Sequence, residues 1–76
     1  MKVRWFKAGR GLFSATVEGL GGLRYNLIVE RMPGRGWDWA MWCATRPQIG
    51  KRDGATRSAK AGMAAAERAA TDRLAL

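Results

Sequence analysis

Three tryptophans, Trp37, Trp39 and Trp42, fall within six positions near the middle of this 76-residue chain. If the stretch is a strand, alternation places Trp37 and Trp39 on one face and Trp42 on the other. A buried aromatic side chain removes about 150–250 Å² of surface from water. A chain this short can hide such a strand only at the centre of its core, so residues 36–45 are expected to form the central strand.

Alternating apolar and polar residues predict further strands on the N-terminal side. Residues 12–18 (LFSATVE) and residues 23–31 (LRYNLIVER) both alternate, as half-buried strands do. Residues 2–7 (KVRWFK) are short and aromatic, and they are also interpreted as a strand. The sequence MPGRG over residues 32–36 predicts a turn before the tryptophan strand. Residues 46–54 are interpreted as a polar, basic loop with room for a short edge strand.

The last segment predicts a helix over residues 58–75. Ser58 is a good N-cap, and the run that follows is rich in alanine, the best helix former. Gly62 interrupts this helix at a cost of about 1 kcal/mol relative to alanine, unless it permits close packing. The apolar stripe is mostly alanine and comprises Ala59, Met63, Ala66, Ala70 and Leu74.

A helix lined by alanine can approach a sheet closely, so bulky sheet residues must fill the space between the two layers. The side chains expected to do so are aromatic: Phe13, Tyr25, Trp37 and Trp39. The sequence therefore predicts one α+β domain over residues 1–76. Its expected architecture is an antiparallel sheet of three or four strands packed on one C-terminal helix.

Charge is the strongest compositional signal. Fourteen Lys and Arg residues face six Asp and Glu residues, for a net charge of +8. Residues 1–57 hold eleven of the bases and four of the acids, a net charge of +7, so the positive field belongs to the strands and loops. Such a field favours a polyanionic partner, either nucleic acid or an acidic protein surface. The alternative is a basic surface that is simply solvated.

Catalytic chemistry is poorly represented. The chain has no histidine and one cysteine, which excludes Ser-His-Asp and Cys-His triads and a zinc site. The acids of the strand region are scattered singly, so no paired-carboxylate or Mg²⁺ site is predicted. Cys43 lies in an apolar strand and is expected to be a buried thiol. We expect a protein that is not an enzyme and that needs no cofactor or metal.

No stretch approaches the ~20 apolar residues of a membrane span. The N-terminal residues, with Arg4, Lys7 and Arg10, lack the apolar run of a signal peptide. A cytoplasmic location without membrane contact is therefore expected.

The sheet face away from the helix is predicted to recognise a partner, because Trp42 lies there beside Arg24 and Asn26. An indole can stack, while a guanidinium and an amide form hydrogen bonds. Trp42 could instead cover the second side of the sheet or form a homodimer contact.

The tripeptide Gly-Arg-Gly occurs at residues 9–11 and 34–36, each time before a strand. In a meander the first and third turns lie at one end, so Arg10 and Arg35 are expected to form a basic rim there, near Lys7 and Arg31. The candidates for base contact are Asn26 and Trp42. The candidates for phosphate contact are Arg4, Arg10, Arg24, Arg31, Arg35, Lys51 and Arg52.

Three features together resemble a known arrangement: the Trp-x-x-Ala strand Trp37 to Ala40, the small residues 54–58, and the alanine-rich helix 59–70. Over residues 12–70 the chain is similar to the ethylene-response-factor DNA-binding domain and to the arm-type DNA-binding domain of tyrosine recombinases. In both families the sheet lies in the DNA major groove. The resemblance implies that Arg24, Arg31 and Trp42 contact bases or phosphates.

The expected function is non-enzymatic binding of nucleic acid by a protein of phage or mobile-element type, through a basic sheet face and loop tips. The alternative is an inhibitor similar to anti-CRISPR proteins, which are also very small and free of motifs. Such an inhibitor would bind acidic patches of a Cascade-type CRISPR-Cas complex, or of another host nucleoprotein complex, and obstruct its access to DNA. A third possibility is an assembly subunit whose basic face meets an acidic partner.

Overall fold

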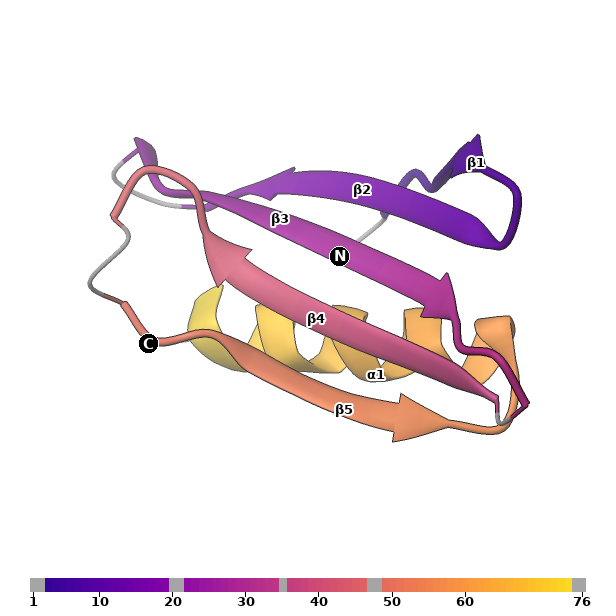
Figure 1. The fold of residues 1–76 in the computed structure, drawn as a ribbon. Helices are drawn as coiled ribbons and strands as arrows, with labels where there is room; N and C mark the ends of the chain where they lie inside the picture. Colours follow the sequence, from indigo (N-terminus) through magenta and orange to yellow (C-terminus); the bar gives the residue numbers. More distant parts are fainter. Residues whose placement is uncertain (1–2, 20–21, 35, 47–48, 75–76) are drawn as a thin grey trace.

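The computed structural model describes residues 3–19, 22–34, 36–46 and 49–74, which form one antiparallel sheet followed by one helix (Figure 1). The sheet has five strands in chain order, and each pairs with the next. The elements are β1 (Phe6–Gly9), β2 (Leu12–Glu18), β3 (Arg24–Arg31), β4 (Trp37–Cys43), β5 (Arg52–Thr56) and α1 (Ala59–Leu74). The predicted α+β architecture is confirmed. The sheet gains a fifth strand because β5 pairs with β4 where a basic loop with a short edge strand was expected.

The first strand begins later than predicted. Residues 3–5 precede β1, and Val3 and Trp5 pack against the core instead of pairing in the sheet. The indole nitrogen of Trp5 donates a hydrogen bond to Glu67 of α1, at 2.8 Å, which ties this segment to the helix. In the described part of the chain, no helix is long and apolar enough to span a membrane.

Helix α1 covers one face of the sheet and lies behind it in Figure 1. The predicted alternation is confirmed in the central strands, where Leu27 and Val29 of β3 and Met41 and Cys43 of β4 are at most 1% exposed. Opposite them lie three alanines of α1, all at most 2% exposed: Ala66, Ala69 and Ala70. Cys43 is a buried free thiol, as expected.

Gly62 permits the close approach of helix and sheet. A Cβ atom at this position would lie 3.0 Å from a methyl group of Val29 and 3.1 Å from the Thr56 hydroxyl. Both contacts are tighter than ordinary van der Waals packing, so the cost of a glycine inside the helix is offset by the approach it allows.

The four aromatic residues expected between the layers all lie on the helix side of the sheet, and two of them belong to the core or pack against it. Tyr25 is 2% exposed within the core and Trp39 packs against it, as predicted. Phe13 and Trp37 lie outside this cluster, and their rings pair with each other at a centroid distance of 6.0 Å. Phe13 lies opposite Val29 and Trp37 opposite Thr56, toward the end of the sheet where the chain turns into α1.

Overpacking tests the contact between the helix and the sheet. Replacing Ala66, which is fully buried, by leucine is expected to cost about 1–3 kcal/mol of the free energy of unfolding, measured by urea denaturation. The matched control is Ala64→Leu, at an exposed position of the same helix, which should leave that free energy nearly unchanged. Equal stability of both variants would contradict the observed packing.

Candidate nucleic-acid interface

Two turns meet at one end of the sheet. The backbone nitrogen of Arg31 donates a hydrogen bond to the carbonyl oxygen of Gly11, at 2.8 Å, which joins the end of β3 to the β1–β2 turn. Trp37 lies opposite Arg31 and also pairs with Thr56, the last residue of β5. Strand β5 therefore ends at this end of the sheet as well. The structure thus places Arg10 near Arg31, as the meander argument predicted. Arg35, the further member of the expected rim, lies outside the described residues.

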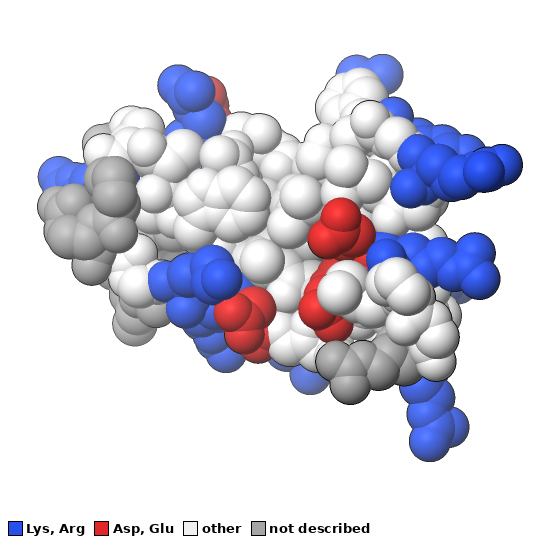
Figure 2. Space-filling model, viewed as in Figure 1, with Lys and Arg blue, Asp and Glu red and all other residues white. Residues whose placement is uncertain are grey.

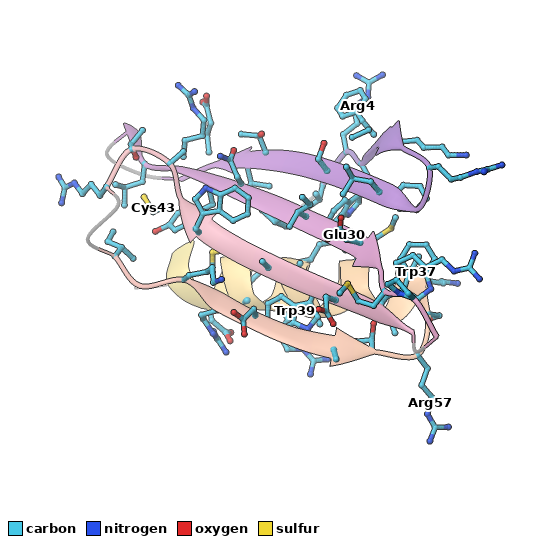
Figure 3. All side chains as sticks on the ribbon, viewed as in Figure 1. Arg4, Glu30, Trp37, Trp39, Cys43 and Arg57 are labelled. Atoms are coloured by element: carbon cyan, nitrogen blue, oxygen red, sulfur yellow. The ribbon has the colours of Figure 1, made fainter. Side chains whose placement is uncertain are left out.

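Four cations make up this region, which we call the basic end: Lys7, Arg10, Arg31 and Arg57. All four are exposed, and Figure 2 shows a group of Lys and Arg side chains projecting at the right of the molecule. Arg57 extends away from the sheet at its lower right (Figure 3). Between described residues there are two ion pairs, Lys51–Asp53 and Arg52–Asp72, and neither includes a member of the basic end. Its positive charge is therefore not neutralised by these pairs.

Two aromatic rings of the basic end lie opposite cations. Phe13 is paired with Lys7 across β1 and β2, and Trp37 with Arg31 across β3 and β4. Residues directly opposite each other on antiparallel strands share a face of the sheet. Both rings are half-buried, and they meet at an interplanar angle of 40°. The basic end therefore combines cations with aromatic surface on the helix side of the sheet.

The first turn of α1 adds to this positive potential. The backbone nitrogen of Ala61 donates a hydrogen bond to the Ser58 hydroxyl, at 3.1 Å, so Ser58 caps the helix as predicted. A helix N-terminus carries about half a positive charge, which acidic residues commonly offset. This first turn has no acidic residue, and it contains Lys60.

The predicted contact residues do not form one site. Asn26 and Trp42 lie opposite each other on the face away from the helix, and the Thr16 hydroxyl donates a hydrogen bond to the Asn26 side-chain oxygen at 3.3 Å. Arg24 is on the same face, at the far end from Arg10 and Arg31, opposite Glu18. These three residues are therefore separated from the basic end.

Three further predicted contacts have other neighbours. The guanidinium carbon of Arg4 lies 5.7 Å from the centre of the Phe6 ring. Lys51 pairs with Asp53 at 3.3 Å. Arg52 lies on the helix side, in register with Met41, and pairs with Asp72 of α1 at 3.5 Å. Of the predicted contact residues that the structure describes, only Arg10 and Arg31 belong to the basic end.

The sheet face away from α1, here called the open face, is not basic. Strand register places four of the six acids of the chain on it: Glu18, Glu30, Asp38 and Asp53. Figure 2 shows acidic side chains in the middle of this face and Lys and Arg at its margins. Most of the described bases of residues 1–57 lie in turns, at strand ends or on the helix side, so the open face differs from the basic face that the summed charge predicts.

Arg57 is a member of the basic end that the sequence did not predict as a contact residue. Its position depends on β5, since it follows directly on the last residue of that strand. Its place in the sequence, between a predicted edge strand and the N-cap Ser58, could have indicated that it lies at an end of the sheet.

No family model matches the sequence, and searches of curated proteins and of solved structures found no match. Of the resemblance stated above, the structure supports the coarser part: an antiparallel sheet, here of five strands, followed by a C-terminal helix. A functional assignment rests on the geometry and charge of the surface.

Proposed function

We propose that this protein binds nucleic acid, without catalysis, through the basic end. The observation that carries the proposal is the gathering of four exposed cations on converging turns and strand ends, two of them opposite aromatic rings. Lysine and arginine displace counterions from phosphates, and this term supplies most of the affinity for nucleic acid. Aromatic surface beside them can pack against bases or sugars.

The proposed contact differs from that of the modules which the sequence resembles. Those modules lay the sheet in the major groove, and here that orientation would bring Glu30 and Asp38 of the open face against DNA phosphates. We therefore propose that the end of the sheet approaches the nucleic acid and that the open face points away from it. A cytoplasmic location and a phage or mobile-element type belong to the same proposal.

Salt dependence tests the proposal directly. Anisotropy of a fluorescently labelled random-sequence duplex should rise on addition of the protein at low salt, and the affinity should fall steeply as salt is raised. If the four cations of the basic end each contact one phosphate, the log–log slope should be about −3.6, since each contact contributes about −0.9. The same titration with a single strand should give a slope of about −2.8, at about −0.7 per contact.

Absence of any anisotropy change at low salt would contradict nucleic-acid binding. The same cations would then be directed at an acidic protein surface, as in the alternative of an inhibitor that docks on a CRISPR-Cas or other nucleoprotein complex. Pull-down of such a complex by the protein, with loss of the complex's own DNA binding, would establish that alternative.

A further inference from the structure

The open face combines an apolar floor with a hollow. Ile28 and Ala40 lie opposite each other at its centre, in one row with Ser14 and Asp53. A hollow of about 450 Å³ opens above this floor and is bordered by Glu30, Asp38, Lys51 and Asp53. Phe6, paired with Ser14, is 57% exposed at one side of the face.

A second hollow continues this surface toward the other end of the sheet. It has a volume of about 480 Å³ and is lined by Asn26, Trp42, Ala44, Ile49 and Lys51. Lys51 borders both hollows, so they form neighbouring parts of one surface. Trp42 is half-buried, and its indole belongs to the lining rather than to the core.

Two carboxylates of this face lie where their repulsion lowers the stability of the fold. Glu30 lies directly opposite Asp38 across β3 and β4, and like charges in that position destabilise a sheet. The two ion pairs seen between described residues leave both of them without a cation. The chain has fourteen Lys and Arg residues, yet none of those described is paired with either carboxylate. An arrangement of this kind is stabilised when a partner supplies the positive charge.

We propose that the open face docks a protein segment that carries arginine side chains. A guanidinium group is planar and donates paired hydrogen bonds to carboxylates, which suits Glu30 and Asp38 at the border of the hollow. It also stacks on indole faces, which suits Trp42. The aliphatic part of the arginine side chain would cover Ile28 and Ala40.

Charge complementarity favours an arginine-carrying segment over nucleic acid on the open face. A nucleic-acid backbone would meet carboxylates on this face. The protein as a whole carries +8 and repels a cationic peptide at long range, so binding of such a peptide has to come from a local acidic surface. The pair Lys51–Asp53 is well exposed, with side chains 61% accessible, so Asp53 can exchange Lys51 for an incoming arginine at little cost.

The test uses a synthetic peptide of four Arg-Gly repeats and a control peptide with glutamate in place of arginine. Calorimetric titration at low salt should show binding of the arginine peptide alone, with a change in tryptophan fluorescence that Trp42→Ala reduces. Asp38→Asn should weaken this binding by about tenfold or more, as loss of one charge-assisted contact does.

The matched control is Asp72→Asn, which removes the same charge from α1, on the other side of the sheet, and should leave peptide binding unchanged. Thermal unfolding supplies a second measurement, because Asp38→Asn relieves the repulsion with Glu30 and should unfold at the same or a higher temperature. Duplex binding by Asp38→Asn should be retained, which separates this surface from the basic end.

Three results would overturn the proposal. The first is no binding of the arginine peptide by the wild-type protein. The second is equal weakening by Asp38→Asn and Asp72→Asn, which would indicate an effect of net charge. The third is a homodimer that Asp38→Asn or Trp42→Ala dissociates in sedimentation experiments, because a second copy of the chain would then occupy the open face.

Discussion

Replacing Arg10, Arg31 and Arg57 together by glutamine is expected to reduce duplex binding by about a thousandfold. Each lost charge-assisted contact with a phosphate costs about 1.5 kcal/mol or more, and the three residues contribute independently from different turns and strand ends. The log–log salt slope should become shallower by about 2.7. Anisotropy titrations of the same duplex over a series of salt concentrations measure both effects.

The control variant has the same net charge as this variant but carries its three substitutions outside the basic end. Arg24, Arg46 and Arg68 are exposed residues outside the basic end, and changing all three to glutamine also lowers the net charge from +8 to +5. This control should retain most of the affinity and most of the salt slope. If both triple variants lose affinity equally, binding follows net charge and the basic end is not the interface. Circular dichroism of both variants checks that the fold is intact.

The central strands could be predicted because one face of the sheet is buried. In β3, residues on the open face such as Asn26 alternate with buried residues such as Leu27. The two-residue period of the sequence therefore matches the observed burial. The helix was predictable for a related reason. Ala66 and Ala70 continue the apolar stripe at helical spacing, and they are the residues that meet the sheet.

Strand β5 could not be predicted with the same certainty. Its sequence Arg-Asp-Gly-Ala-Thr includes Asp53 and Gly54, which have low strand propensity, and it shows no apolar alternation. It is held by pairing with β4 and by the indole of Trp39, which lies against Gly54. Tertiary contacts therefore override local propensity. The position of Arg57, and with it one quarter of the basic end, depends on these contacts.

The charges of the open face and of the helix side are set by the alternation of side chains along each strand, which composition does not show. Glu30 and Arg31 are adjacent in sequence, yet the first lies on the open face and the second on the helix side, opposite Trp37. A sum of charges over residues 1–57 merges these two faces and conceals their opposite signs. The same alternation separates the tryptophans: Trp39 packs on the core, Trp42 lines the open face, and Trp37 joins Phe13 at the basic end.

Trp39→Ala is expected to remove about 3–5 kcal/mol from the free energy of unfolding. A domain of 76 residues has a total of about 4–11 kcal/mol, at about 0.05–0.15 kcal/mol per residue, so this loss removes at least about a quarter of that free energy. The matched control is Trp37→Ala, on the same strand and face but outside the core cluster. It should cost less than Trp39→Ala, because the indole lies outside the core cluster. Its loss removes the pair with Phe13, worth about 0.5–1.5 kcal/mol, together with the surface that the half-buried ring covers. Urea denaturation of both variants measures the difference.

A second substitution shows whether Trp39 acts through its contact with β5. A Cβ atom on Gly54 would lie 2.7 Å from the indole nitrogen of Trp39, so Gly54→Ala in the wild-type protein should cost about 1–3 kcal/mol. In the Trp39→Ala background that clash is absent, and alanine should be neutral or should stabilise the strand by about 0.5–1 kcal/mol. The two changes should thus be coupled by at least about 1 kcal/mol. Simple additivity would mean that β5 does not depend on this contact, and the placement of Arg57 at the basic end would lose its structural support.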